Sequence, residues 1–396
     1  MSKMVIDPRV RGFVCVNAHP RGCYHEVAQQ VLAVKSLPKL NIPKNILVIG
    51  GSTGYGLAST IVPTFAGWGN TISISLERGP TASRTASAGW YNSASFNLLA
   101  RHHKYYARTL NQDAFADATK AEVREVIKQE LGQLDILIYS VAAPRRTDPD
   151  TGVVYNSVIK PTEQDFVSKT LNILSKNVQN VSIPCANSAE ISDTIAVMGG
   201  SDWRRWIEYL SEHNLLAPGF KTLAYSYVGP EFTYPIYKQG TIGLAKEHLL
   251  QTAKQLNQHL EAHCNGSAMV SVHKAITTQA SAAIPTVPLY VAILYKVMKA
   301  QNVHENAVQQ IYRLFRDYLC GSVKGKVDAD GQFRLDDLEL RPDIQQQVSA
   351  NFDQIDSNNL AELADVDGYI NDFYKLFGFN IDEIDYSVAV DPNILV

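Results

Sequence analysis

The sequence lacks an excess of either charge. Its 36 Lys and Arg residues are balanced by 39 Asp and Glu residues, for a net charge of −3. Proteins that bind nucleic acid through its phosphates carry a basic surface, so the composition gives no indication of a nucleic-acid partner. The 10 histidines are scattered without the short spacings of zinc ligands, and we expect no metal site.

Cysteine is scarce, and its pattern excludes two common uses. The chain has five cysteines, an odd number, and no C-x-x-C motif. A disulfide framework or a paired redox motif is therefore not indicated. We expect reduced thiols in a cytoplasmic protein at these positions: Cys15, Cys23, Cys185, Cys264 and Cys320.

A long hydrophobic run is also missing. The most apolar stretch, AAIPTVPLYVAILYKVM, is interrupted by Pro285 and Pro288 and closed by Lys296. It is shorter than the ~20 residues that a membrane-spanning helix needs. The N-terminal segment MSKMVIDPRVRG has no apolar run of the kind found in signal peptides. We therefore expect a soluble cytoplasmic protein without a membrane partner.

Apolar strand patterns alternate with amphipathic helix patterns along the chain. The segment AEVREVIKQELGQL (121–134) has apolar residues on one helical face. This alternation predicts an α/β fold, a doubly wound Rossmann-type parallel sheet, in a single enlarged domain that spans residues 1–396. The predicted strands are NILVIG (45–50), NTISISLE (70–77), YYARTL (105–110), DILIYSVAA (135–143), KTLAYSYVG (221–229) and AMVSVHKA (268–275).

Two regions exceed a minimal nucleotide-binding unit. Residues 144–220 are predicted to be an insertion on the ligand-facing edge of the sheet, and residues 321–396 a C-terminal extension. Trp203 and Trp206 fit either an acyl tunnel or core packing equally well. The stretch DADGQFRLDD resembles a calcium loop only superficially, because Lys326 would occupy the first ligand position. A turn is the better interpretation.

The segment VIGGSTGYGLAST has the features of a phosphate-binding turn. Gly50, Gly54 and Gly56 stand directly after a predicted strand and before a predicted helix. A pyrophosphate must approach backbone N–H groups at a helix N-terminus, and side chains in the turn would block that approach. The G-x3-G-x-G spacing is that of the short-chain dehydrogenases and their relatives. We therefore predict a dinucleotide site.

The ends of the following strands offer further cofactor contacts. Glu77, about 20 residues after the glycines, can accept hydrogen bonds from adenosine ribose hydroxyls and would repel a 2′-phosphate. This favours NADH over NADPH, although the neighbouring Arg78 weakens the inference, and a solvated acid at a strand end is the alternative. Asp113 can meet the adenine amino group, and the small residues at Val141-Ala142 let a cofactor lie across the strand ends.

The stretch YPIYKQGTIGLAK (234–246) holds two Tyr–Lys pairs. Tyr234 and Lys238 form Y-x3-K, whereas Tyr237 and Lys246 form Y-x8-K. A nearby ammonium lowers the pKa of a phenol and improves it as a proton donor. Which of the two pairs is reactive depends on where the helix begins.

The residues between the pairs argue against the first pair. Pro235 is tolerated only in the first turn of a helix, and Gly240 and Gly243 make a helix across 234–246 poor. A new helix beginning near Thr241 is more plausible. On one continuous helix, nine residues turn ~900°, which would put Tyr237 opposite Lys246. The second pair therefore works only if Tyr237 precedes the helix.

Seven long motifs are distributed along the whole chain: VCVNAHPRGC, GGSTGYGLAS, YSVAAPRRTDPDTG, VMGGSDWRRWI, TLAYSYVGPE, YKQGTIGLAKEHL and TTQASAAIPTVPLY. Through these motifs the sequence strongly resembles, from end to end, the FabV-type enoyl-ACP reductases, which are grouped with the trans-2-enoyl-CoA reductases and are enlarged relatives of the short-chain dehydrogenases.

The resemblance implies an NADH-dependent reduction of trans-2-enoyl thioesters, carried on acyl-carrier protein or coenzyme A, by a monomeric enzyme. It implies that Tyr237 and Lys246 are the active pair and that Tyr227 contacts the substrate. Thr277 departs from the valine frequent in the family, which leaves a side-chain role there open. The implied NADH contacts are Gly50, Gly51, Ser52, Thr53, Gly54, Tyr55, Leu76, Glu77, Asp113, Ala114, Val141, Ala142, Lys246, Ile276, Thr277 and Thr278.

Two other functions remain to be tested. A hydroxy/keto oxidoreductase would use Tyr234 and Lys238, and it would oxidise NADH with simple ketones rather than enoyl thioesters. A catalytically idle NAD-binding module would use the tryptophan-bearing segment to bind a partner, and it would show no enoyl-dependent oxidation of NADH.

Overall fold

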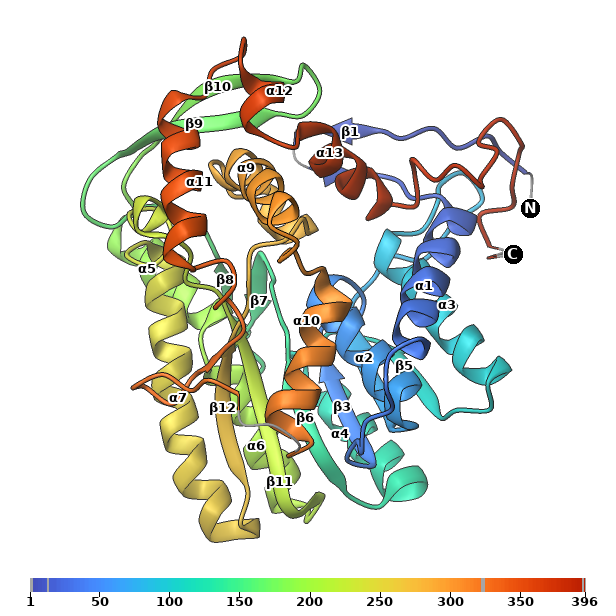
Figure 1. Ribbon diagram of the computed structural model, residues 1–396. Coiled ribbons are helices and arrows are strands. Elements are labelled where there is room, and N and C mark those ends of the chain that lie inside the picture. Colours follow the sequence, from blue (N-terminus) through green and yellow to red (C-terminus); the bar gives the residue numbers. More distant parts are fainter. Residues whose placement is uncertain (1–2, 13, 322–324, 394, 396) are drawn as a thin grey trace.

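The centre of the protein is a seven-stranded sheet in which every neighbouring pair of strands is parallel. The structure is a computed structural model that describes residues 3–12, 14–321, 325–393 and 395 (Figure 1). Across the sheet the strands lie in the order β13 (Phe333–Arg334), β12 (Ser267–Val272), β11 (Leu216–Ser226), β6 (Leu134–Tyr139), β3 (Asn45–Ile49), β4 (Asn70–Ser75) and β5 (Ala107–Asn111).

The strand order reverses in the middle of the sheet. The chain runs outward from β3 through β4 to β5, then returns to β6 and continues outward through β11 and β12. Every residue of β3 is buried, as expected for a parallel strand covered on both faces. The predicted doubly wound α/β fold is confirmed. In such sheets, ligands bind at the carboxyl ends of the strands beside the point of reversal, here between β3 and β6.

Helices cover both faces of the sheet. One layer shares an apolar core with alternate strand residues such as Ile46 and Val48, and the other packs on their neighbours Leu47 and Ile49. The first layer contains α1 (Pro20–Lys35), α2 (Gly54–Gly67), α3 (Ala88–His102) and α10 (Ala307–Leu314), which a π-helical turn (Phe315–Leu319) extends. The second contains α4 (Asp117–Val126) with a π-helical turn (Ile127–Leu131), α6 (Ser201–Glu212) and α7 (Thr241–Cys264).

The two tryptophans of α6 lie inside the second layer. Trp203 and Trp206 have no exposed surface, and the Trp203 indole donates a 2.8 Å hydrogen bond to the Thr222 hydroxyl of β11. Of the two interpretations, core packing is therefore the one observed. Within 144–220, α6 and the start of β11 belong to the main layers. The remainder consists of α5 (Ser188–Met198) and the hairpins β7–β8 (Arg145–Thr147, Val154–Asn156) and β9–β10 (Phe166–Asn172, Asn177–Ile183).

A third apolar cluster lies above the carboxyl ends of the sheet, at the top of Figure 1. The cluster contains residues of α9 (Val287–Ala300), α11 (Pro342–Gln354), α12 (Leu360–Leu363) and α13 (Val366–Lys375), and β1–β2 (Val10–Arg11, Val14–Cys15) and α8 (Gln279–Ala282) also pack into it. The Lys169 ammonium of β9 donates to the carbonyls of Phe352, Asp353 and Ile355 at the end of α11, and so joins the β9–β10 hairpin to the C-terminal extension.

The C-terminal extension begins with the turn expected around Asp330 and Gly331. Gly331 has a φ of +80°, and Val327 and Phe333 form an antiparallel bridge across the turn. The Asp328 carboxylate accepts backbone N–H bonds from Asp330 and Gln332, so it stabilises the turn itself. Among the described residues, no helix is long and apolar enough to cross a membrane, and the five cysteines are free thiols.

Candidate active site

The glycine loop joins β3 to α2 at the reversal point of the sheet. Gly50 and Gly54 have φ values of +87° and +52°, which L side chains rarely adopt. A Cβ on Gly50 would lie 2.2 Å from the Ser140 carbonyl oxygen, so β6 also requires glycine there. Thr53, the residue before α2, makes no side-chain cap bond. The N-terminal amides of α2 are therefore available to the phosphates of a dinucleotide.

The start of α2 packs against the segment that follows β12. The Tyr55 hydroxyl lies 2.8 Å from the Lys274 carbonyl oxygen and 3.0 Å from Gln310 Oε1. A Cβ on Gly54 would lie 3.2 Å from the Thr278 methyl carbon. The glycine loop and the predicted Ile276–Thr278 contact segment are thus brought together across more than 200 residues of sequence.

The Ile276–Thr278 segment is fixed by side-chain hydrogen bonds. The Thr277 amide and hydroxyl both lie 3.1 Å from the Tyr295 hydroxyl of α9, and the Ser281 hydroxyl donates to the Ile276 carbonyl. Thr278 caps the short helix α8. The Thr277 side chain therefore faces α9, where its hydroxyl supports the segment.

Glu77 lies one residue beyond the exposed Leu76, after β4, and its carboxylate is held in place. Ser52 of the glycine loop donates to Oε1 at 2.7 Å, and Ser87 donates to Oε2 at 2.5 Å. Ser87 immediately precedes α3, whose positive N-terminal end favours a nearby anion. Each carboxylate oxygen has a further lone pair, so the arrangement can still accept ribose hydroxyls. Glu77 is thus more than a solvated acid at a strand end.

Asp113 and Ala114 follow β5 above a buried ion pair. The Asp113 carboxylate accepts the Phe115 amide, and the Ala114 carbonyl accepts hydrogen bonds from Trp206 and Lys120. The Lys120 ammonium lies 3.0 Å from Asp202 Oδ1, and both side chains are almost fully buried. The loop that would face the adenine therefore rests directly on the core of the second helical layer.

Val141 and Ala142 follow β6, beside the glycine loop. The Ser140 amide donates to the Ile49 carbonyl, which continues the β3–β6 pairing up to these residues. Val141 packs partly against the second-layer core, and Ala142 is exposed. The residues that follow β6 therefore lie directly beside the glycine loop that follows β3.

Tyr227 and Tyr237 lie together at the carboxyl end of β11. Tyr227 directly follows that strand, and the two ring centroids are 4.9 Å apart in an edge-to-face arrangement. Tyr237 is 8% exposed, and its hydroxyl makes no hydrogen bond within the described part of the chain. Burial raises the pKa of Tyr237, which keeps the phenol protonated at neutral pH. It can therefore act as a hydrogen-bond donor.

Tyr234 and Lys238 have a different arrangement. Glu231–Thr233 forms a single 3₁₀ turn, and residues 234–239 continue as turns rather than as a helix. The Lys238 ammonium is exposed and lies 4.5 Å from the centre of the Tyr234 ring. The Y-x3-K pair thus forms a cation–π contact at the surface.

Lys246 lies in the second turn of α7, which begins at Thr241 as predicted. Its ammonium donates a 2.9 Å hydrogen bond to the Tyr225 carbonyl near the end of β11. Burial lowers the pKa of Lys246 to about 8. A Cβ on Gly243 would lie 1.8 Å from the Lys238 carbonyl oxygen, so only glycine lets the preceding turn, with Tyr237, fold back on the first turn of α7.

Sequence reasoning missed several residues around these side chains. Ser87 holds Glu77, and Glu339 accepts a hydrogen bond from Tyr227. The only sequence signal for Glu339 is its place between two leucines in DLEL, which predict that this segment packs against the core. Tyr227 lies 112 positions away in the sequence, so no local motif could have linked it to Glu339.

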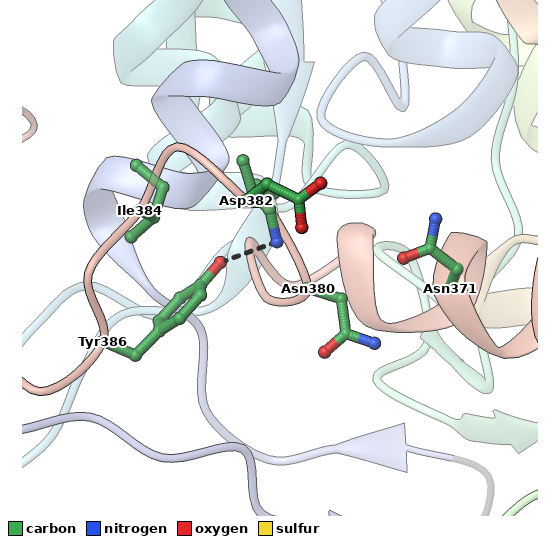
Figure 2. Close-up of a pocket in the computed structure, with 6 residues that line it drawn as sticks. Asn371, Asn380, Asp382, Ile384 and Tyr386 are labelled. Carbon is green, nitrogen blue, oxygen red and sulfur yellow. Dashed lines mark hydrogen bonds between the residues drawn. The ribbon is translucent and has the colours of Figure 1, made fainter.

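A separate hollow lies in the C-terminal extension (Figure 2). Its volume is about 460 Å³, and the Tyr386 hydroxyl on its wall accepts a hydrogen bond from the Ile381 amide. None of the predicted site residues lines it. The lining residues are Asn371, Asn380, Ile381, Asp382, Ile384 and Tyr386.

Two family models together match most of the chain. The family model described as the trans-2-enoyl-CoA reductase catalytic region matches residues 84–320, and the NAD(P)H binding domain of trans-2-enoyl-CoA reductase matches residues 5–82. The chain belongs to the trans-2-enoyl-CoA reductase family. A third family model, which is described as an enoyl reductase FAD binding domain, matches residues 327–390.

The curated relatives of this chain have two different names. An enoyl-[acyl-carrier-protein] reductase [NADH] of Coxiella burnetii is 45% identical over 390 residues, which cover 98% of this chain and 96% of the relative. A trans-2-enoyl-CoA reductase [NADH] of Ruminiclostridium cellulolyticum is 45% identical over 391 residues, which cover 99% and 98% of the two chains. The resemblance inferred from the motifs is confirmed.

Solved structures of the family have the same fold along the whole chain. The trans-2-enoyl-CoA reductase of Clostridium acetobutulicum in complex with NADH superimposes with a TM-score of 0.97 at 41% identity, over 99% of each chain. The trans-2-enoyl-CoA reductase of Treponema denticola in complex with NAD gives a TM-score of 0.92 at 41% identity, over 98% of each chain.

Proposed function

We propose that this protein reduces the carbon–carbon double bond of trans-2-enoyl thioesters to the saturated acyl thioester with NADH, the last reductive step of fatty acid elongation. Membership in the trans-2-enoyl-CoA reductase family supports this activity. The observation that carries it to particular residues is the packing of Tyr237 against Tyr227 at the carboxyl end of the sheet, with the Tyr237 hydroxyl making no hydrogen bond to any described residue.

The cofactor is NADH, and the loops after β3 to β6 fit it. The pyrophosphate would lie against the uncapped N-terminus of α2, where Gly50 and Gly54 leave room for it. Glu77 would accept the adenosine ribose hydroxyls, and Asp113 would meet the adenine. Ile276–Thr278 and Lys246 would border the nicotinamide ribose, and the hydrogen bonds to Tyr295 and the Tyr225 carbonyl orient these groups in advance.

In the proposed mechanism, the protein supplies placement and electrostatic stabilisation. When bound, NADH supplies the hydride that reaches C3 of the enoyl group. Negative charge then develops on the thioester oxygen, and Tyr237 donates a hydrogen bond to it, which stabilises the enolate most where its charge is largest. The Tyr237 proton then passes to the enolate and ends on C2, which completes the reduction, and the phenolate left on Tyr237 regains a proton from solvent. The Lys246 ammonium would hold the ribose and stabilise that phenolate.

Two relatives are equally identical to this chain, and one is named for acyl-carrier protein and the other for coenzyme A. The carrier of the thioester is therefore a separate question. We propose that both carriers are accepted, because the reacting atoms of the thioester are the same in each. Kinetics on matched enoyl chains of four to twelve carbons, attached to either carrier, measure the preference. A kcat/KM that is zero for one carrier would restrict the function to the other.

The test of the proposed function is the oxidation of NADH by the purified protein. With crotonyl-CoA, NADH absorbance should fall and butyryl-CoA should form in equal amount. Simple ketones should give no oxidation above background, because Tyr234 and Lys238 are engaged with each other at the surface. Oxidation with ketones alone would favour a keto reductase. Absence of oxidation with every enoyl thioester would favour an idle NAD-binding module.

We further propose that the enzyme acts as a monomer in the cytoplasm. The site is assembled from one chain, since the glycine loop follows β3 of the sheet, and Tyr227, Tyr237 and Lys246 follow β11 of the same sheet. Sedimentation equilibrium should give a mass near 43.8 kDa. A mass twice this value at the concentrations used for assay would contradict the proposal.

A further inference from the structure

Glu339 of the C-terminal extension is a fully buried carboxylate that lies against the candidate site. Its Oε1 accepts hydrogen bonds from the Tyr227 hydroxyl at 3.0 Å and the Tyr290 hydroxyl at 2.5 Å. Its Oε2 accepts the Ala275 amide at 2.6 Å. All three partners are donors, which suits the acceptor-only ionised form of the carboxylate.

The hydrogen bond to Glu339 makes the two tyrosines of the site unequal. A phenol has one proton to donate, and Tyr227 directs its proton to the carboxylate. The Tyr227 oxygen can then offer only lone pairs to a substrate. Tyr237, whose ring lies edge-to-face on that of Tyr227, has no such partner in the described part of the chain. Its proton remains available.

The same carboxylate also fixes the cofactor side of the site. Ala275 immediately precedes the Ile276–Thr278 segment, so the bond to Oε2 anchors the start of that segment. The neighbouring Lys274 ammonium is buried, donates to the Ala275 carbonyl at 2.8 Å and lies 5.3 Å from the centre of the Tyr295 ring. Burial raises the pKa of Glu339, and the charge of Lys274 opposes that rise.

We propose that Glu339 is a positioning residue that accepts the hydroxyl hydrogen bond of Tyr227 and thereby leaves Tyr237 as the hydroxyl that donates to the substrate oxygen. This inference rests on the proposed enoyl reductase function. The proposed role gives the C-terminal extension a part in the site, because Glu339 lies between β13 and α11, far along the chain from the glycine loop and the Tyr–Lys pair.

A double-mutant cycle tests the inference. Glu339→Gln, Tyr227→Phe and the double variant are compared for kcat and KM on crotonyl-CoA and for the Kd of NADH. Glutamine keeps the shape but has only one acceptor oxygen. The Ala275 amide can only donate and retains that oxygen, so the NH₂ group faces Tyr227 and Tyr290, and Tyr227 loses its acceptor. Glu339→Gln should lower kcat roughly 10- to 100-fold with the Kd of NADH within about twofold. In the Tyr227→Phe background, the same change should alter kcat by less than about twofold.

An additive cycle, in which Glu339→Gln lowers kcat by the same factor with or without the Tyr227 hydroxyl, overturns the inference. An unchanged kcat in Glu339→Gln also overturns it. A wild-type protein that is inactive on every enoyl thioester overturns both the inference and the proposed function. An active wild type with an additive cycle rejects only the part assigned to Glu339.

Tyr290→Phe is the matched control. It removes the other hydroxyl from the same carboxylate oxygen and leaves the bond from Tyr227 in place. We expect its melting temperature to fall as that of Glu339→Gln does, while its kcat stays within about threefold of wild type. A kcat loss equal to that of Glu339→Gln would assign the effect to packing. If Glu339→Gln does not fold, Tyr227→Phe and Tyr290→Phe still decide, because equal losses of kcat overturn the inference.

Discussion

The two halves of the candidate site are built in different ways. The cofactor half consists of short loops that each follow one strand of the sheet, and two of them rest on its buried core. The substrate half joins side chains from the end of β11, where Tyr227 follows the strand, from the turn before α7 and from the C-terminal extension. Loops attached to strand ends are positioned by the sheet itself, whereas the tyrosines depend on contacts between distant segments. Damage to the first half should therefore appear as lost stability, and damage to the second as lost turnover.

The buried pair beneath the adenine loop should give the largest effect. Asp202→Asn leaves the Lys120 ammonium buried without its charged partner, and we expect the free energy of unfolding to fall by about 3–5 kcal/mol. Urea denaturation measures this loss. Asp150→Asn is the control, because Asp150 pairs with Arg205 at the surface, where a lost ion pair costs about 0–1 kcal/mol. Equal losses in the two variants would contradict the prediction.

The choice between the two Tyr–Lys pairs comes next. Tyr237→Phe removes the free hydroxyl, and we expect kcat on crotonyl-CoA to fall ~10²-fold or more with NADH binding retained. Tyr234→Phe is its matched control and should keep kcat within about twofold, since the Tyr234 ring contacts the exposed Lys238 ammonium and a phenylalanine ring can keep that contact. Turnover and the Kd of NADH are measured for both. Near-normal turnover in Tyr237→Phe would reject the assigned donor.

A smaller change should follow from Glu77→Ala. Without the carboxylate, a ribose 2′-phosphate is no longer repelled and the 2′-hydroxyl loses an acceptor. The ratio of kcat/KM for NADPH to that for NADH should therefore rise ~10-fold. Ser87→Ala, which removes one of the two hydroxyls that hold Glu77, should move the ratio in the same direction by less. A constant ratio in Glu77→Ala would exclude the ribose contact.

The smallest effect concerns pH. The pKa of Lys246 is lowered to about 8 by burial, so its ammonium is lost as the pH rises through that value. We expect kcat/KM to halve near pH 8 and to decline above it. Since the folded pKa lies below the unfolded value, the charged form destabilises the fold below about pH 8, and this penalty disappears as the pH rises toward 10.5. A flat profile of kcat/KM between pH 7 and 9.5 would contradict the assignment.

Lys274 shares the lowered pKa of about 8, so the pH profile needs a control. In Lys274→Met, the alkaline decline of kcat/KM should remain if it belongs to Lys246. Loss of the decline in that variant would assign it to Lys274.

The parallel sheet and the glycine loop could be predicted from the sequence because each depends on local features. Continuous apolar strands, turn residues and helical periodicity specify them over ten to twenty neighbouring residues. The start of α7 at Thr241 could also be predicted, since Pro235 and the two glycines exclude a longer helix. The glycine loop lies against the segment that follows β12, and the cofactor contacts assigned to both segments stay a prediction.

The remaining parts depend on contacts that the sequence does not display. The tryptophans of α6 have a pattern that fits a tunnel as well as a core, and only the sheet beneath them decides. Glu339 has no motif around it, because its partners belong to the residue after β11, to α9 and to the segment after β12. Its role emerges from three hydrogen bonds, each to a distant part of the chain.

The close fit of Gly243 under the Lys238 carbonyl has a consequence for chain length. The turn that carries Tyr237 and the helix that carries Lys246 are in contact at this glycine, so the segment between them cannot accommodate an added residue without moving one of the two. One inserted residue after Thr241 would rotate Lys246 by ~100° about the helix axis and withdraw its ammonium from the Tyr225 carbonyl. The eight residues between Tyr237 and Lys246 are therefore a fixed length in this protein, and an insertion or deletion within them should separate the two side chains.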